Sequence, residues 1–125
     1  MICILLMIKE GVPEYLFDGT TIPTYELSEA CINTNYYGVK GVTEALLQLL
    51  QSSDSSRVVN VSSLLGKLML IGNEWAIEIL DNIEELTEEK IDEVINAFLQ
   101  DFKDGSLAEK GWSTVLPAYT VSKVT

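Results

Sequence analysis

The sequence predicts an α/β protein in which helices cover parallel strands, because two short apolar runs flank one long amphipathic stretch. Residues 1–8 and 57–62 have the length and aliphatic composition of buried strands. Residues 24–50 between them have helical periodicity, and a strand, a helix and a strand in this order are typical of a parallel sheet. At 125 residues, 47% of them hydrophobic, the chain suits a single domain.

The first apolar run is expected to be a strand that ends in a turn at Lys9, Glu10 and Gly11. It is too short for a membrane-spanning helix, which needs about 20 residues, and it lacks the basic start of a signal peptide. Residues 11–23 contain two glycines and two prolines, so we expect a loop there.

One face of the helix predicted over residues 24–50 is apolar except for a single amide. The stripe consists of Ile32, Asn35, Val39, Val42, Leu46 and Leu50. A buried amide must be hydrogen-bonded, and by itself Asn35 is typical of a structural bond to neighbouring backbone. Gly38 and Gly41 each cost about 1 kcal/mol relative to alanine in a helix, which predicts that a neighbouring element packs closely against them.

The second strand, residues 57–62, follows a polar linker and is expected to be buried. Ser63 lies at its exit, directly before Leu64, Leu65 and Gly66. The chain contains no histidine, so this serine is not a nucleophile of the usual kind. Its hydroxyl can donate a hydrogen bond to a carbonyl oxygen, although a serine that only caps a loop has the same pattern.

Most of the net charge of −11 lies in an acidic segment, residues 72–111, that interrupts the strand and helix alternation and is expected to be a helical insertion. Thr87 begins a predicted helix, and Gly105 ends it. Its apolar stripe is Ile91, Val94, Ile95, Phe98, Leu99 and Phe102. A solvated acidic face is the usual interpretation, and the alternative is an interaction module that uses residues 87–104 against a basic partner.

Composition excludes several classes of function. A pI near 4.2 argues against nucleic acid and anionic membranes as partners. The absence of histidine removes Ser-His-Asp triads and histidine-ligated metals, so no metal site is expected. Cys3 and Cys31 form neither a CxxC motif nor a disulfide framework, which predicts a reducing compartment and a cytoplasmic protein.

A helix is expected to begin near Pro117 and to carry Tyr119 and Lys123 on one face, because they are four residues apart. A phenol with its usual pKa of about 10 is a poor acid or base at neutral pH, and a nearby ammonium favours its ionised form. The pair is therefore a candidate for proton transfer, although a Tyr and Lys at this spacing are also common on protein surfaces.

Three motifs in order resemble the short-chain dehydrogenase/reductase family. They are Asn35-Tyr36-Tyr37-Gly38, then the run from Val58 through Ser62, Ser63, Leu64, Leu65 and Gly66, and finally Tyr119 through Lys123. They match NxxG, a strand ending in SSxxG, and YxxxK. Ser63 and Tyr119 are 56 positions apart, and a long acidic insertion there resembles the monomeric carbonyl-reductase branch, especially plant reductases of terpenoid and alkaloid ketones.

The resemblance implies that residues 1–125 form the central part of an NAD(P)-binding, Rossmann-like domain with three layers, α/β/α. Tyr119 would exchange a proton with the substrate oxygen, and Lys123 would favour the ionised phenol and bond the nicotinamide ribose. Ser63 would hold the substrate oxygen, and Asn35 would anchor a water that relays protons to Lys123. The implied cofactor is NADPH or NADP, the partner is a small carbonyl or alcohol substrate, and a monomer is expected.

The chain departs from the family pattern at both ends. The glycine-rich cofactor loop that precedes these motifs in the family has no counterpart here, and neither do the later strands and substrate lid. The sequence is therefore compatible with two functions. The first is an NADPH-dependent carbonyl reductase or alcohol dehydrogenase, and the second is a truncated, catalytically inactive remnant that is unable to bind cofactor.

Overall fold

The structure is a computed structural model that describes residues 2–4 and 23–125. Its strands are β1 (Ile2–Ile4) and β2 (Val58–Asn60). Its α-helices are α1 (Tyr25–Ile32), α2 (Gly38–Gln51), α3 (Glu74–Asp81), α4 (Glu88–Lys103) and α5 (Pro117–Val124). A π-helix, η2 (Asn33–Tyr37), joins α1 to α2, and two 3₁₀ turns, η3 (Leu64–Gly66) and η4 (Leu68–Leu70), follow β2. No described helix is long and apolar enough to cross a membrane.

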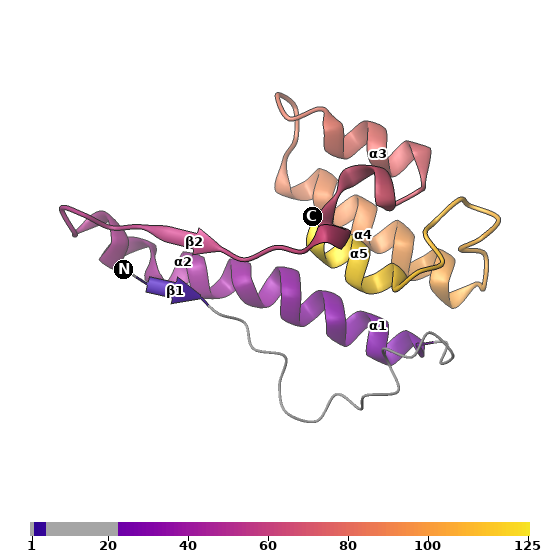
Figure 1. The fold of residues 1–125 in the computed structure, drawn as a ribbon, viewed down its shortest axis with the longest axis horizontal. Helices are drawn as coiled ribbons and strands as arrows, with labels where there is room; N and C mark the ends of the chain where they lie inside the picture. Colours follow the sequence, from indigo (N-terminus) through magenta and orange to yellow (C-terminus); the bar gives the residue numbers. More distant parts are fainter. Residues whose placement is uncertain (1, 5–22) are drawn as a thin grey trace.

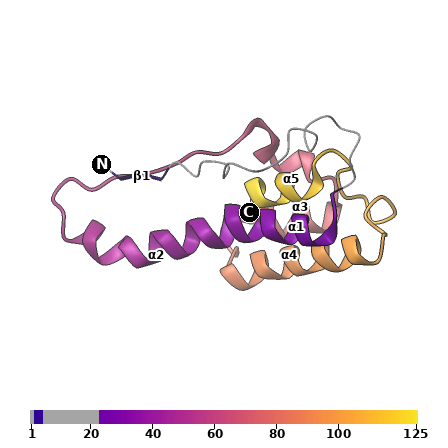
Figure 2. The ribbon, with the colours of Figure 1, turned by 90° about the horizontal axis from the view of Figure 1, so that it is seen from below.

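The two strands pair in parallel, with Ile2 opposite Val58 and Ile4 opposite Asn60. The helical run from α1 to α2 connects them in the chain and lies below them in Figure 2. The predicted order of strand, helix and parallel strand is therefore confirmed. The rest of the predicted first strand and nearly all of the predicted loop lie outside the described residues.

The strand predicted within residues 57–62 is observed as β2, but the prediction that it is buried is wrong. Val58, Val59 and Val61 are 44%, 46% and 58% exposed. Among the described residues, β2 pairs only with β1, and α3, α4 and α5 stand beyond the end of the strand (Figure 1). Burial of a strand depends on neighbours that are remote in sequence, so a β-branched composition alone does not determine it.

The helix predicted over residues 24–50 is observed as one continuous run, but its middle turn is wider than an α-turn. The backbone N–H of Gly38 donates to Asn33 O, five residues earlier. A Cβ at Gly38 would lie 3.3 Å from that same oxygen, whereas a Cβ at Gly41 would meet no described atom within 4 Å. The expectation that a neighbouring element packs against these two glycines is therefore wrong, because the tight contact of Gly38 is inside its own helix.

The core lies where α1 passes between α5 and α4, as Figure 2 shows. Phe98, Val94 and Ile95 of α4 are at most 1% exposed and confirm the apolar stripe predicted for this helix. The Phe98 ring packs edge-to-face on Trp112, with 5.3 Å between centroids, and the Trp112 indole N–H donates to Asp101 Oδ2 at 2.8 Å. The hydroxyl of Thr87 caps α4, as predicted.

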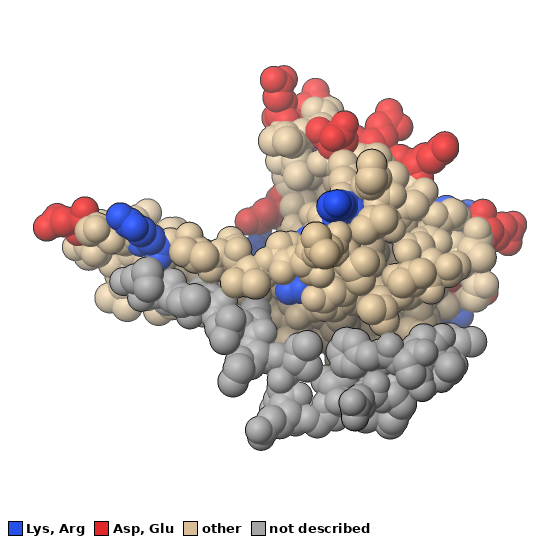
Figure 3. All heavy atoms as spheres, viewed as in Figure 1, with Lys and Arg blue, Asp and Glu red and all other residues tan. Residues whose placement is uncertain are grey.

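Helix α3 was not predicted, although Asn73 caps its first turn by accepting from the backbone N–H of Ala76 at 2.9 Å. Acidic side chains gather over the end of the molecule that carries α3 in Figure 3.

Two polar contacts join α4 to the helical run formed by η2 and α2. The Tyr37 hydroxyl donates to Asp92 Oδ1 at 2.6 Å, and Lys40 Nζ lies 2.6 Å from Glu88 Oε2. Burial raises the pKa of Tyr37, and the Asp92 carboxylate raises that pKa further.

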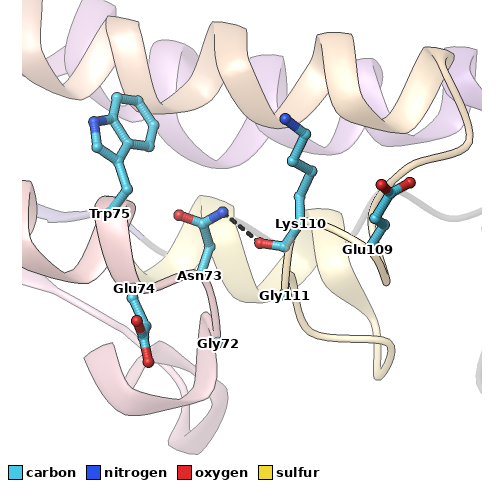
Figure 4. Close-up of a pocket in the computed structure, with 7 residues that line it drawn as sticks. All are labelled: Gly72, Asn73, Glu74, Trp75, Glu109, Lys110 and Gly111. Atoms are coloured by element: carbon cyan, nitrogen blue, oxygen red, sulfur yellow. Dashed lines mark hydrogen bonds between the residues drawn. The ribbon is translucent and has the colours of Figure 1, made fainter.

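The two ends of the acidic segment meet. Gly72 and Gly111 have φ values of +81° and +79°, and a Cβ at Gly72 would lie 2.5 Å from Gly111 O. Beside them, Ser113 N donates to Ile71 O at 2.9 Å and Asn73 Nδ2 donates to Lys110 O at 2.7 Å (Figure 4). The hollow of about 390 Å³ at this junction is lined by residues 72–75 and 109–111 and by none of the candidate site residues.

Candidate functional site

Helix α5 carries Tyr119 and Lys123 one turn apart, as the spacing predicts. Pro117 occupies its first turn, after Leu116 enters the left-handed region at φ 46°. The Lys123 ammonium lies 5.7 Å from the centroid of the Tyr119 ring, and both side chains are partly exposed. Among the described residues, no carboxylate forms an ion pair with Lys123.

Asn35 contacts this helix from the neighbouring η2 through its side chain. Its amide nitrogen donates to Ser122 Oγ at 3.0 Å and contacts Cys31 Sγ at 3.5 Å. The expected structural bond of Asn35 is thus present, but its partners are side chains and not backbone. Asn35 lies in the π-helix η2, and π turns of this kind are frequent at functional sites.

The loop that leaves β2 runs onto the carboxyl end of α5, as Figure 1 shows. A Cβ at Gly66 would lie 2.7 Å from Lys123 O and 2.7 Å from Ser62 Oγ, so η3 and α5 are in direct backbone contact. Ser62 Oγ is 3.4 Å from Lys123 O and can donate to it. Ser63 Oγ accepts from Leu65 N at 3.2 Å, which is the loop-capping bond that its sequence also allowed.

The fold therefore packs the exit of β2, which carries Ser63, and the π-helix η2, which carries Asn35, against α5, the helix of Tyr119 and Lys123. These groups offer a phenol, an ammonium and a hydroxyl, together with a fixed amide. Such a set can hold a carbonyl oxygen, exchange a proton with it and bind polar hydroxyls of a cofactor. Among the described residues no group of acidic or cysteine side chains is arranged to hold a metal ion.

The contact of Gly66 with α5 gives a direct test of this arrangement. Gly66→Ala should lower the free energy of unfolding by about 1–3 kcal/mol, because its Cβ would push η3 away from Lys123. Urea unfolding of the chain measures the change. Gly41→Ala is the matched control, since its Cβ meets no described atom and alanine in a helix should stabilise by about 0.5–1 kcal/mol. Equal effects at the two positions would contradict the contact.

Comparison with known proteins places these motifs in a family. The chain is 54% identical over 116 residues to short-chain dehydrogenase/reductase 1 of Saponaria officinalis, covering 93% of the chain and 38% of that relative. It is 53% identical over 103 residues to (+)-neomenthol dehydrogenase of Capsicum annuum, covering 82% and 33%. Carbonyl reductase [NADPH] 1 of Mus musculus is 33% identical over 119 residues, covering 95% and 41%. The chain belongs to the short-chain dehydrogenase/reductase family.

Two solved structures of the family agree with the fold. Menthone neomenthol reductase from Mentha piperita superposes with a TM-score of 0.80, and salutaridine reductase from Papaver somniferum with 0.78. Both are 53% identical, and each comparison covers 82% of this chain and 35% of the other. The predicted partial Rossmann-like α/β fold is confirmed by this likeness. No protein-family model matches the sequence. The chain spans 33% to 41% of the length of these curated relatives.

The sequence did not single out Ser122, Ser62 and Cys31, whose side chains contact Asn35 or the backbone of Lys123. Ser122 is 4% exposed and contacts Asn35, 87 positions earlier in the chain. The only local signal for Ser122 was its position three residues after Tyr119, where its hydroxyl donates to Tyr119 O at 2.8 Å. Cys31 lies 3.8 Å from Ser122 Oγ, and burial raises the pKa of its thiol, so this cysteine is protonated at neutral pH.

Proposed function

We propose that these residues form the catalytic centre of an NADPH-dependent carbonyl reductase that acts on a small terpenoid- or alkaloid-like ketone, or on the corresponding alcohol in reverse. The observation that carries the proposal is the packing of η2, with Asn35, and of the exit of β2, with Ser63, against α5, on which Tyr119 and Lys123 lie one turn apart. The relatives named neomenthol dehydrogenase, salutaridine reductase and carbonyl reductase support this substrate class, and the last of these names includes NADPH.

The residues present fit a nicotinamide cofactor. When bound, the cofactor supplies or accepts the hydride. The Tyr119 phenol donates a proton to the ketone oxygen during reduction and takes it back during alcohol oxidation. The Lys123 ammonium lies one turn from the phenol and donates hydrogen bonds to ribose hydroxyls. Ser63 donates to the same ketone oxygen, and Asn35 holds a water that relays protons towards Lys123.

We also propose that residues 1–125 are the central part of an NAD(P)-binding domain, that residues 72–111 are a helical insertion in it, and that the protein is a cytoplasmic monomer. The competing proposal is that these 125 residues cannot bind cofactor and are catalytically inactive. The exposure of Val58, Val59 and Val61 favours it, because a sheet of two short strands covers little of its own apolar surface.

Titration of the 125-residue chain with NADPH distinguishes the two proposals. If the chain forms the cofactor site, nicotinamide fluorescence should change with a dissociation constant below about 1 mM, and excess NADPH should raise the thermal midpoint. The matched control is Lys123→Met, which keeps the length of the side chain and removes the ammonium. Absence of any saturable change in fluorescence and midpoint would support the inactive chain.

A further inference from the structure

Ser122 faces the core, whereas the two residues of the same helix proposed for catalysis are partly exposed. Its side chain is 4% exposed, and its neighbour Val121 is 1% exposed. Helix α5 therefore has an outer face with Tyr119 and Lys123 and an inner face with Ser122. A buried hydroxyl must find partners inside the protein, so the contacts of Ser122 are structurally constrained.

Those contacts fix the direction of each hydrogen bond. A backbone carbonyl only accepts, so at 2.8 Å the Ser122 hydroxyl donates its proton to Tyr119 O. With its proton used there, the Ser122 oxygen acts as the acceptor for the Asn35 amide at 3.0 Å. The chain of bonds thus runs from Asn35 through Ser122 to the turn of α5 that carries Tyr119.

The remaining partner of the Asn35 nitrogen is a poor substitute. Cys31 Sγ lies 3.5 Å away, and a thiol sulfur is a weak acceptor. Without the Ser122 hydroxyl, the partly buried Asn35 amide would lose its stronger hydrogen-bond acceptor, and leaving a buried donor without such a partner costs free energy. Asn35 also lies in the π-helix η2, which packs against α5, so its position depends on this contact between two elements.

We propose that Ser122 is a positioning residue, whose hydroxyl holds the Asn35 side chain in register with the Tyr119 turn of α5. The inference deepens the proposed function and rests on it, because Asn35, Tyr119 and Lys123 are assigned there to one reaction. Ser122 does not touch substrate or cofactor in this scheme. It acts by fixing the distance between the proton relay at Asn35 and the phenol.

Hydrogen exchange of the Asn35 side-chain amide, followed by NMR on the 125-residue chain, tests the contact without any need for activity. In Ser122→Ala this amide should exchange about 10–100-fold faster than in the unmodified chain. Ser122→Thr keeps a hydroxyl and should restore slow exchange. Thr120→Val is the matched control, because Thr120 is equally buried in α5 and bonds Val115 O, away from Asn35.

Steady-state kinetics in the active reductase that contains this sequence test the consequence. Ser122→Ala should lower kcat about 10–100-fold, with KM for NADPH changed less than about twofold. Ser122→Thr should recover most of kcat, and Thr120→Val should leave it unchanged. If Ser122 had only a structural role, Ser122→Ala and Thr120→Val would both lower the fraction of folded enzyme, and kcat would not distinguish the two variants.

Each outcome decides the inference. Faster Asn35 exchange in Ser122→Ala with recovery in Ser122→Thr supports it. Equal exchange in the unmodified chain and Ser122→Ala overturns it, and so does an unchanged kcat. If no polypeptide containing this sequence reduces a ketone, the proposed function fails, and the exchange experiment alone still decides whether Ser122 positions Asn35.

Discussion

Tyr119→Phe is expected to lower kcat of the reductase by about 10²–10⁴-fold, which is the usual contribution of a positioned acid or base. The change removes one hydroxyl and keeps the ring that lies beside the Lys123 ammonium. Helix α5 should therefore keep its position, and the affinity for NADPH should stay within about threefold of the original. Initial rates of NADPH oxidation with a cyclic terpenoid ketone, together with a fluorescence titration of NADPH, measure the two effects separately.

A second tyrosine controls for the loss of a phenol hydroxyl. Tyr25 lies in α1, where its hydroxyl contacts Glu29 Oε1 at 3.2 Å, and it takes no part in the proposed reaction. Tyr25→Phe should retain full activity. If Tyr119→Phe kept more than a tenth of the original kcat, the phenol would not be the proton donor, and the proposed mechanism would be wrong.

Phe98→Ala is expected to lower the free energy of unfolding by about 3–5 kcal/mol. Phe98 is fully buried at the centre of the core, with its ring edge-to-face on Trp112 and 6.1 Å from the ring of Phe102. Alanine would leave a cavity between α4 and the segment that leads to α5, so the loss should reach the candidate site. Urea unfolding followed by the fluorescence of Trp112 measures it, in a background where the exposed Trp75 is changed to Phe.

Two further variants keep this prediction decisive. Asn96→Ala lies on the exposed side of the same helix and should change stability by less than about 0.5 kcal/mol. Phe98→Leu retains most of the apolar volume and should cost clearly less than alanine, which provides a measurable value if Phe98→Ala does not fold. Similar midpoints for Phe98→Ala and Asn96→Ala would show that this core is not the main source of stability.

The elements that the sequence predicted well are those whose signals are local. The cap at Thr87, the stripe through Phe98 and the glycine after α4 lie within one short segment, and Pro117 lies at the start of α5. The parallel pairing of β1 with β2 also followed from the order of elements. Helix α3 was missed although its Asn73 cap was visible, because its eight residues make little more than two turns and give only a short periodic signal.

The predictions that failed depend on contacts between residues remote in sequence. The exposure of Val58 and the open surroundings of Gly41 depend on which elements lie nearby. The wide turn around Asn35 is invisible to periodicity, because the helix continues on both sides of it. Ser122 was missed for the same reason, since its partner Asn35 is brought to it only by the packing of η2 on α5.

The junction at Gly72 and Gly111 bears on how such a chain can vary. The polypeptide leaves the neighbourhood of Ile71 and returns to it at Ser113, where a backbone hydrogen bond closes the excursion. A segment whose two ends meet at one point can be lengthened, shortened or exchanged without redirecting the chain before or after it. We expect tolerated length changes to concentrate in the loops of this segment that lie farthest from the junction. The left-handed glycines at its two ends should stay fixed by their mutual contact.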